Sequence, residues 1–376
     1  MGWRCARGLA KAALSRPLLW NAKREDQLSV FGFTCIVPLY NSPVRAAAII
    51  HAYLKPQVVD PFRDARVDVF RGNALEPNDL PDVAMVFGGD GSVHRVLPSL
   101  AYTQTPMLVV PAGTANDFAR CIGITNQSEA LRAWRRYLDR GDNVRTIDLG
   151  SVRPMADSGP GDFEQLDSMT YADDEGRIPR PERPLGPVIM RHHLRRAEES
   201  ATHQRVIYFS GIAGLGLDAD TNQRANQMPS WLRRHGGYAI AALRALMKYS
   251  PPTVRLHSYD ACGRETCLEG PVLFVAVGNS PEYGSGIRML PQAQLDDGQL
   301  DLCFVPAMSK GFVLLHFHRI YSGTHLKVPK VRYFRTRQVF IESNAPIPIY
   351  ADGEYLCQTP AEISNSPRAL RVIVPA

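Results

Sequence analysis

Apolar runs and helix-spaced apolar positions alternate along the first part of the chain. Runs of aliphatic and aromatic residues predict strands at Phe31–Val37, Arg66–Phe70, 84–87 and Met107–Val110. Apolar positions at helical spacing predict helices at about 44–54, 93–100 and 128–139. Strands that alternate with helices are typical of a parallel α/β sheet, whose ligands lie beyond the carboxyl ends of its strands.

Short strands dominate the second part of the chain. The alternating pattern predicts them at Val206–Phe209, Val254–Tyr259, Val272–Val277, Leu300–Val305, Val331–Arg335, Val339–Ile341 and Ile347–Tyr350. Helices are predicted at about 230–249 and 310–321. Many short strands with turn residues between them indicate a β-sandwich or a barrel.

The length of 376 residues is enough for two domains with separate cores. We predict a basic N-terminal extension over 1–30, a nucleotide-binding α/β domain over 31–145 and a β-sandwich domain over 146–365. Residues 153–203 hold six prolines and separate acidic and basic halves, so we predict a disordered insertion there. The pattern leaves open which domain takes the last apolar run, within 366–376.

Charge and cysteine content narrow the class of protein. The net charge is +6, and residues 1–30 supply +4 of it, so the remainder is near neutral and argues against a nucleic-acid-binding protein. Seven scattered cysteines without metal-ligand spacing favour free thiols in a reducing cytoplasm over disulfides or zinc. No apolar run approaches the roughly 18–20 residues that span a bilayer, so we expect a soluble or peripheral protein.

A glycine-rich turn follows the strand predicted at 84–87. Gly88, Gly89, Asp90, Gly91 and Ser92 stand where that strand gives way to a helix. Glycines let backbone N–H groups approach an anion, and a helix N-terminus adds partial positive charge. The turn therefore predicts a phosphate cradle, although the same residues also suit an ordinary turn.

Three further segments carry candidate chemistry. Thr114 offers a hydroxyl in a second strand-to-helix turn, where it equally suits a helix cap. Asp296, Asp297 and Asp301 surround a glycine turn that either binds Mg²⁺ or forms an acidic hairpin. Asp352-Gly353 predicts a type I′ hairpin turn, which either only connects strands or presents Glu354 as a general base.

Six motifs, taken in order, resemble the bacterial diacylglycerol kinase-like lipid kinases, which include sphingosine and ceramide kinase relatives. They are 88–92, 111–120, 214–219, 279–289, 296–301 and 352–354. The resemblance covers about Phe31 to the C-terminus apart from the insertion. It implies a nucleotide domain like those of phosphofructokinases and NAD kinases, joined to an all-β sandwich that binds lipid.

The resemblance also implies the roles of single residues. ATP would contact Gly88, Gly89, Asp90, Gly91, Ser92, Val93, His94 and Thr114. Asp297 and the main-chain carbonyls of Gln294 and Gln299 would hold Mg²⁺, and Glu354 would take the proton from the acceptor hydroxyl. The chain departs from the family at Ser92, where Thr is usual, at His94-Arg95, where Asn-Glu is usual, and in an irregular loop at Pro38–Pro43.

The sequence thus predicts an ATP- and Mg²⁺-dependent lipid kinase whose most favoured acceptor is diacylglycerol. An NAD kinase-like enzyme and a non-catalytic lipid- or nucleotide-binding relative are the alternatives. A cluster of basic residues precedes the Glu354 hairpin and forms either a solvated strand face or a contact with anionic lipid headgroups or substrate phosphate. Its members are Lys327, Lys330, Arg332, Arg335 and Arg337. We expect a cytoplasmic protein in peripheral contact with its lipid substrate at a membrane surface; the oligomeric state is open, a homodimer being one option.

Overall fold

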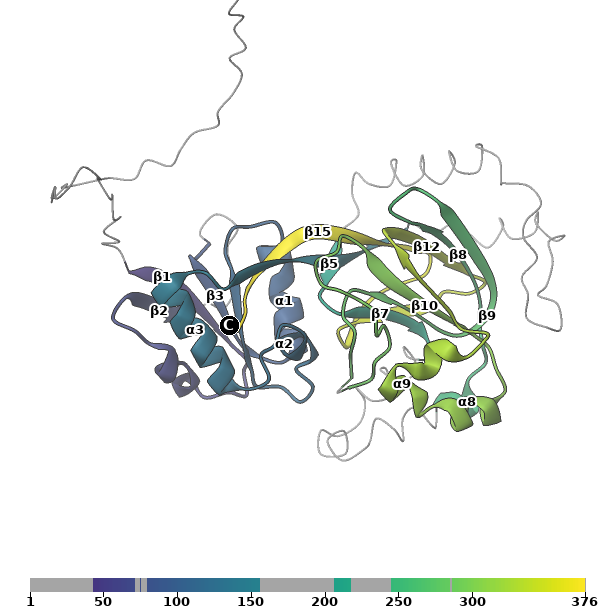
Figure 1. Ribbon diagram of the computed structural model, residues 1–376, viewed down its shortest axis with the longest axis horizontal. Helices are drawn as coiled ribbons and strands as arrows, with labels where there is room; N and C mark the ends of the chain where they lie inside the picture. Colours follow the sequence, from purple (N-terminus) through teal and green to yellow (C-terminus); the bar gives the residue numbers. More distant parts are fainter. Residues whose placement is uncertain are drawn as a thin grey trace, which may run out of the picture. The chain divides into compact units, whose positions relative to one another are not determined.

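The computed structural model describes residues 43–71, 75, 80–155, 206–217, 245–284 and 286–375 (Figure 1). Residues Pro43–Ala376 form one compact unit. The strand predicted at Phe31–Val37, the extension over 1–30 and most of the predicted insertion lie outside the described residues. So does most of the helix predicted at 230–249, of which residues 245–248 are described and helical.

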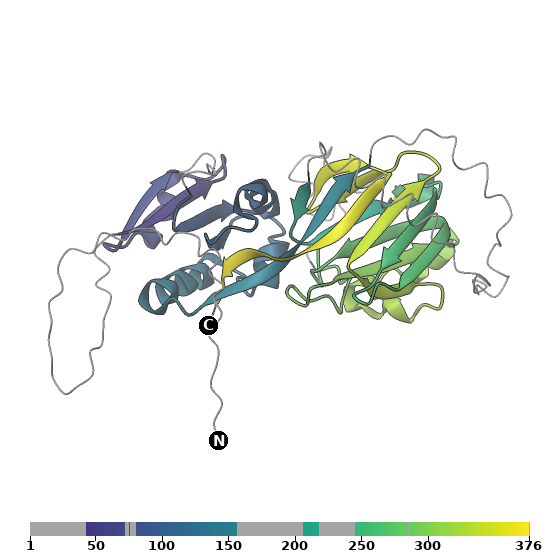
Figure 2. The same cartoon turned by 90° about the horizontal axis from the view of Figure 1, so that it is seen from above.

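Four parallel strands form the first body in the order β2-β1-β3-β4. Their bounds are β1 Val44–Ile50, β2 Val67–Arg71, β3 Val83–Gly88 and β4 Met107–Pro111. The helices α1 (Asp90–Leu100) and α3 (Gln127–Arg140) cover opposite faces of this sheet (Figures 1 and 2). The short 3-10 helix η1 (Pro56–Phe62) packs with α3, where Trp134 Nε1 donates to the Phe62 carbonyl at 2.8 Å.

The helix predicted at 44–54 is wrong, because this segment is strand β1 followed by a loop. Ala46, Ala47 and Ala48 favour a helix by intrinsic propensity, but they are fully or almost fully buried between β2 and β3. Sheet pairing and burial therefore outweigh alanine's preference. The loop after β1 is 51–55, whereas the loop predicted at Pro38–Pro43 lies outside the described residues except for Pro43.

Antiparallel strands form the second body. They are β7 (Ile212–Gly216), β8 (Thr253–Tyr259), β9 (Glu265–Gly278), β10 (Leu300–Pro306), β11 (Arg332–Thr336), β12 (Gln338–Ser343), β13 (Pro348–Ala351) and β14 (Glu354–Gln358). The strands predicted here are confirmed, whereas β7 and β14 are additional. The helix predicted at 310–321 is interrupted, and forms α8 (Lys310–His316) and α9 (Arg319–Ser322), followed by the 3-10 helix η4 (Thr324–Lys327).

Two long strands connect the bodies. β5 (Val144–Pro154) and β15 (Ala361–Ile373) pair antiparallel along their length (Figure 2), and β6 (Ile207–Phe209) pairs with β5. β15 also pairs with β12 in the second body and, at Val372, with Met107 of β4 in the first. The final apolar run therefore reaches the first body at Val372, whereas the start of β15 at residues 361–364 pairs with the second body. The domain limit predicted at residue 145 stays a prediction.

Candidate active site

The two glycine turns predicted from the sequence touch each other. A Cβ atom built on Gly113 would lie 2.6 Å from the Cα of Gly89, which is closer than real Cβ contacts allow. The amide of Ala112 donates to the Gly88 carbonyl at 2.9 Å, which ties the ends of β3 and β4 together. Because glycine alone permits this approach, both turns expose their backbone at one edge of the sheet.

Residues at the start of α1 hold the first turn. Ser92 is buried, and its side chain occupies the space where a Gly88 side chain would lie. The carboxylate of Asp90 crosses to the second turn and accepts a hydrogen bond from Phe118 N at 3.0 Å. Burial, with a smaller contribution from the nearby carboxylates of Asp117 and Asp352, raises the pKa of Asp90 to about 6. Asp90 therefore joins the two turns to each other.

The second turn is closed by Asn116, which adopts a left-handed backbone conformation with φ of 51°. Its side chain accepts from Gly113 N at 2.8 Å and donates to the Gly113 carbonyl at 3.0 Å. Asp117 pairs with Arg120 and accepts from Gly284 N at 2.6 Å, so the 279–289 segment docks onto this turn. Thr114 is exposed, so its hydroxyl is accessible to a ligand.

The predicted hairpin carries Glu354 to the first turn. Asp352 and Gly353 have φ values of 53° and 83°, and Ala351 pairs with Glu354 across them, as a type I′ turn requires. Glu354 is exposed, and its Oε1 atom lies 2.9 Å from where a Cβ of Gly91 would stand. Any larger residue at position 91 would meet this carboxylate, which thus lies over the N-terminus of α1.

Asp352 anchors the hairpin to the segment at Ser210 and Gly211. Its Oδ2 accepts from Ser210 N at 2.7 Å and from the Ser210 hydroxyl at 3.0 Å, while its Oδ1 accepts from Gly211 N at 2.9 Å. The ring of His94, on α1, brings Nδ1 to 3.7 Å from the same Oδ2 atom. The unusual His94 therefore faces the base of the hairpin, and its Nδ1 is buried without a hydrogen bond.

The three carboxylates predicted to form a magnesium site are not gathered into one. Asp296 pairs with Arg145 at 2.8 Å, and Asp301 is fully buried on β10, where burial raises its pKa. Among the described residues no group of three or more His, Cys, Asp or Glu could hold a metal. Successive residues of a turn point their side chains in different directions, so Asp296 lies against Arg145 whereas Asp297 and Asp301 both lie near Arg335.

Asp297 and neighbouring carbonyls nevertheless suit a hard cation. Its Oδ1 accepts from Gln299 N at 3.0 Å, whereas its Oδ2 is buried without a hydrogen bond, 3.5 Å from Nη1 of Arg335. A carboxylate oxygen without a hydrogen bond would, together with the main-chain carbonyls of Gln294 and Gln299, supply the oxygen donors that Mg²⁺ prefers. These residues therefore fit the implied metal by donor chemistry.

Asp148 connects the Asp297 turn to the rest of the site. This buried residue of β5 accepts at Oδ2 from Gly298 N and at Oδ1 from Arg368 N, both at 2.7 Å. Its main-chain carbonyl accepts from Asn279 Nδ2 at 2.9 Å, and Asn279 N in turn donates to the Gly211 carbonyl. A single acid within an apolar strand was the sequence signal that could have identified this link.

The loop after β1 adds two aromatic residues that sequence reasoning missed. Tyr53 is 59 % exposed, and its hydroxyl donates to the Ala112 carbonyl at 2.8 Å, beside the second glycine turn. Its ring lies against the imidazole of His51, with centroids 4.2 Å apart. The sequence-based prediction of a helix at 44–54 is the reason that Tyr53 and His51 were missed, because such a helix would not bring residues 51–53 to the edge of the sheet.

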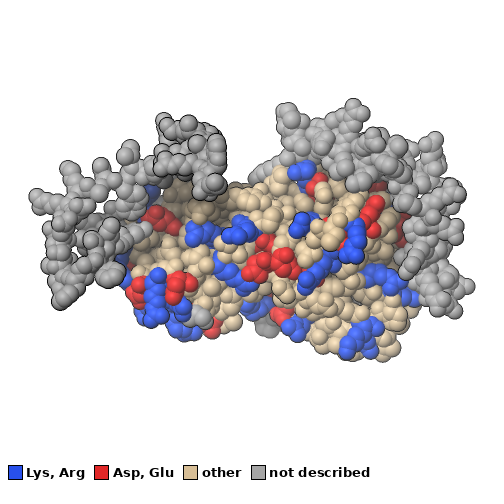
Figure 3. Space-filling view, turned by 45° about the horizontal axis from the view of Figure 1, so that its top comes forward, with Lys and Arg blue, Asp and Glu red and all other residues tan. Residues whose placement is uncertain are grey.

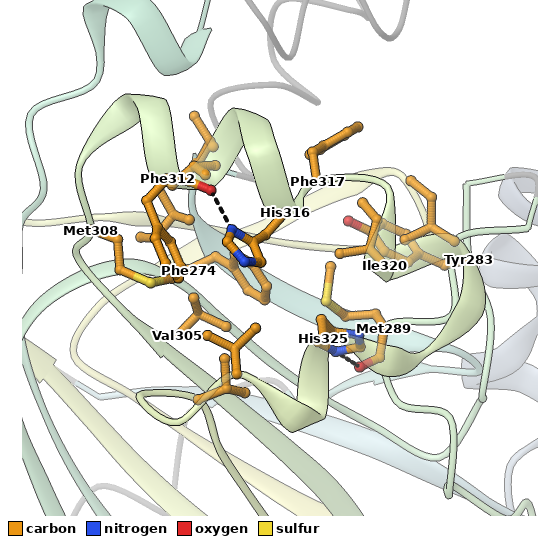
Figure 4. Close-up of a pocket in the computed structure, with 16 residues that line it drawn as sticks. Phe274, Tyr283, Met289, Val305, Met308, Phe312, His316, Phe317, Ile320 and His325 are labelled. Carbon is orange, nitrogen blue, oxygen red and sulfur yellow. Dashed lines mark hydrogen bonds between the residues drawn. The ribbon is translucent and has the colours of Figure 1, made fainter.

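An apolar pocket opens between the second sheet and the helices α8 and α9 (Figure 4). Its sixteen lining residues are Leu217, Leu273, Phe274, Tyr283, Ile287, Met289, Val305, Met308, Phe312, Val313, His316, Phe317, Ile320, His325, Val328 and Val331. Tyr283 directly precedes Gly284, whose amide bonds to Asp117 in the second glycine turn. The pocket and the glycine turns are therefore connected through one short segment.

His325 is a buried polar residue among these apolar ones. Its Nε2 lies 3.2 Å from the Met289 carbonyl, and burial lowers its pKa (Figure 4). A neutral imidazole that donates from Nε2 to this carbonyl leaves Nδ1 as an acceptor. The pocket thus suits a long apolar chain and contains very few polar contacts.

Comparisons with known proteins agree with this geometry. Residues 68–152 match the family described as "Diacylglycerol kinase catalytic domain", and residues 211–374 match "YegS C-terminal NAD kinase beta sandwich-like domain". The chain is 29 % identical over 356 residues to a diacylglycerol kinase of Mycobacterium tuberculosis, covering 89 % of this chain and 92 % of that protein. It is 23 % identical to a diacylglycerol kinase of Bacillus subtilis, covering 78 % of each chain.

A solved structure shows the same fold. A Bacillus anthracis str. Sterne protein assigned as a diacylglycerol kinase superposes with a TM-score of 0.56 at 18 % identity, covering 88 % of this chain and 95 % of that one. The predicted fold class is confirmed: an α/β nucleotide-binding domain is followed by an all-β sandwich-like domain. In the described part of the chain no helix is long and apolar enough to cross a membrane.

Proposed function

Because this chain belongs to the diacylglycerol kinase-like lipid kinase family, we propose that it transfers the γ-phosphate of ATP to a lipid hydroxyl. Diacylglycerol is the acceptor we favour, and phosphatidic acid would be the product. One observation carries the proposal more than any other. The Glu354 carboxylate lies over Gly91, at the helix N-terminus where the phosphate cradle is expected.

The nucleotide would lie along the edge formed by the two glycine turns. Backbone N–H groups from Gly88 to Val93 and the N-terminus of α1 would bind its phosphates, with the exposed Thr114 hydroxyl as a further donor. His94, two residues after Ser92 on α1, faces the Asp352 carboxylate of the hairpin. Tyr53 offers an exposed aromatic face on the same edge, which is suited to stacking against a base.

Glu354 would act as the general base for the acceptor hydroxyl. The carboxylate takes the hydroxyl proton while the hydroxyl oxygen forms a bond to the γ-phosphorus and the bond from that phosphorus to the β,γ-bridging oxygen breaks, releasing ADP. Glu354 is exposed, so an acceptor can reach it. Mg²⁺ held by Asp297 and the carbonyls of Gln294 and Gln299 would supply positive charge that offsets the negative charge of the phosphates.

The apolar pocket supports a lipid acceptor. A buried acyl chain would contact Phe274, Met289 and Val305 and gain about 0.8 kcal/mol for each methylene removed from water. The segment that connects this pocket to the second glycine turn places chain binding near phosphate binding. Pockets of this composition accept many acyl chains, which is why the lipid must be identified by assay.

Incubation with Mg²⁺ and [γ-³²P]ATP would test the proposal. Diacylglycerol, ceramide, sphingosine, undecaprenol and NAD would be offered separately, and label in diacylglycerol is the expected result. Label in NAD alone would refute the lipid reading in favour of an NAD kinase-like enzyme. Label in none of them would support a non-catalytic binding relative.

Glu354→Gln tests the mechanism. We expect kcat to fall by about 10²–10⁴-fold, because the variant cannot accept the proton, while ATP binding is retained. Glu342→Gln, a change of the same charge on β12, should keep the activity of the natural protein. Near-normal turnover of Glu354→Gln would remove this residue from the role of base.

A further inference from the structure

The helices α8 and α9 are apolar on two sides. Phe312, Val313, His316, Phe317 and Ile320 line the pocket beneath them (Figure 4). The large apolar side chains that the same helices expose to solvent include Leu314, Leu315 and Tyr321, at 48 %, 69 % and 51 %. A surface helix normally has one apolar face and one polar face, so the second apolar face requires an explanation.

Exposed apolar side chains concentrate in this one region. Nine large apolar residues are exposed in the described part of the chain, and three of them (Tyr53, Tyr102 and Tyr355) are dispersed tyrosines. The other six are Met247, Phe312, Leu314, Leu315, Phe317 and Tyr321, which we call the apolar patch. Lys310 Nζ donates to the Met247 carbonyl at 2.6 Å, so the backbone of Met247 lies near α8. Contiguous exposed apolar groups of this kind mark sites of interaction.

The segment that carries most of the apolar patch contains basic residues and no acidic residue. Residues 306–337 contain seven Lys or Arg and no Asp or Glu. Lys310, Arg319, Lys327 and Lys330 make no ion pair with a residue that the structure describes. Each lies within two residues of a residue that lines the pocket, and we call these four cations its rim. Elsewhere, on the face in Figure 3, basic and acidic side chains intermingle.

We propose that the apolar patch and its rim of cations dock onto an anionic phospholipid bilayer. Leu314, Leu315 and Phe317 would enter the boundary between headgroups and acyl chains, while Lys327 and Lys330 contact the headgroup phosphates. The inference deepens the proposed function and rests on it. It identifies the surface through which the acceptor lipid would pass from the bilayer into the pocket that the same helices cover.

The charge pattern selects a bilayer as the partner. A second copy of this chain would bring the same cations face to face, since a two-fold interface pairs a patch with itself. Like charges at such an interface are unfavourable, whereas an anionic membrane complements them. Apolar side chains within a ring of Lys and Arg are typical of segments that lie in the membrane interface.

Sedimentation of the full-length protein with vesicles tests the inference. We expect it to bind vesicles of phosphatidylcholine and phosphatidylglycerol, and to bind phosphatidylcholine alone much more weakly. Leu314→Ser/Leu315→Ser should weaken partitioning by at least about tenfold, since two apolar side chains are lost from the interface. Lys327→Gln/Lys330→Gln should weaken it by about fivefold for each charge removed.

Matched variants control for general surface effects. Tyr102→Ser removes an exposed apolar side chain next to α1, and Arg135→Gln removes an exposed cation on α3. Both should bind vesicles like the natural protein. Unchanged vesicle binding by Leu314→Ser/Leu315→Ser would overturn the inference, and so would equal binding to both kinds of vesicle. A change from dimer to monomer in that variant, measured by light scattering, would make the patch a protein interface instead.

Activity on a water-soluble substrate separates this inference from the proposed function. Dihexanoylglycerol is a monomeric diacylglycerol that requires no membrane docking, so the variants of the patch should phosphorylate it at the natural rate. Failure of every variant and of the natural protein would refute the kinase proposal. Phosphorylation of dihexanoylglycerol by all of them, with unchanged vesicle binding, would refute the docking surface alone.

Discussion

Gly113→Ala tests whether the contact between the two glycine turns builds the ATP site. Gly113 has no positive φ, so alanine can adopt its backbone conformation and the effect comes from the added methyl group alone. That group would stand 2.6 Å from Gly89 Cα and 2.8 Å from Asn116 Oδ1. Carbon atoms in ordinary contact are about 3.5–4.0 Å apart, so the turns must separate by about 1 Å.

Such a separation should affect both stability and catalysis. Overpacking of this kind costs about 1–3 kcal/mol of the free energy of unfolding. It also stretches the hydrogen bond from Ala112 N to the Gly88 carbonyl, which aligns the two turns. A displacement of about 1 Å in a positioned group can cost about 10²-fold in rate, so we expect kcat/KM for ATP to fall by about that factor.

Steady-state kinetics with varied ATP, together with urea unfolding, would measure these effects. Gly311→Ala is the matched control, because a Cβ at this position of α8 meets no atom within 4 Å. It should leave kcat/KM for ATP unchanged. A folded Gly113→Ala protein with the kcat/KM of the natural chain would show that the turns do not bind the phosphates, and the reasoning would fail.

Two further predictions concern the carboxylates that hold the site together. Burial raises the pKa of Asp90 from 3.8 to about 6, so the folded state binds its proton more tightly than the unfolded state. Protonated Asp90 therefore contributes about 3 kcal/mol to the free energy of unfolding below pH 4, and this contribution is lost as the pH rises through 6. The urea midpoint of the natural protein should fall between pH 4 and 6, whereas that of Asp90→Asn should not show this fall. Asp352→Ala leaves the amides of Ser210 and Gly211 without an acceptor, so the free energy of unfolding measured in urea should fall by about 2–4 kcal/mol. It should also lower kcat, because the hairpin that positions Glu354 loses its anchor. Asp352→Asn, which keeps an acceptor oxygen, should lose less; equal losses in both variants would contradict this account.

The strand β1 shows how far local pattern reaches. Its alanines have a strong helix preference, and the sequence-based prediction followed that preference. Pairing on both sides by β2 and β3 reverses it, and such pairing depends on residues that are remote in the chain. The same error concealed Tyr53 and His51, which reach the site only because β1 ends at the edge of the sheet.

The acidic turn before β10 shows that closeness in sequence does not predict a shared site. Spacing alone suggested that Asp296, Asp297 and Asp301 would act together. The fold pairs Asp296 with Arg145 of β5 and buries Asp301, so each carboxylate has a different environment. Which of several neighbouring carboxylates retains a usable oxygen depends on the elements packed around the turn. The assignment of Asp297 to Mg²⁺, like the domain limits and the cytoplasmic location, stays a prediction.

The sequence by itself determined most strands of both bodies, the glycine turns and the type I′ hairpin, but it did not predict β1, β7 or β14 as strands. These features depend on local physics, because apolar periodicity, missing Cβ atoms and positive φ act within a few residues. Only the tertiary structure brought Glu354 over Gly91, 263 positions earlier in the chain, and gave α8 and α9 their second apolar face. Contacts between distant segments depend on the packing of whole sheets, and no local pattern encodes them.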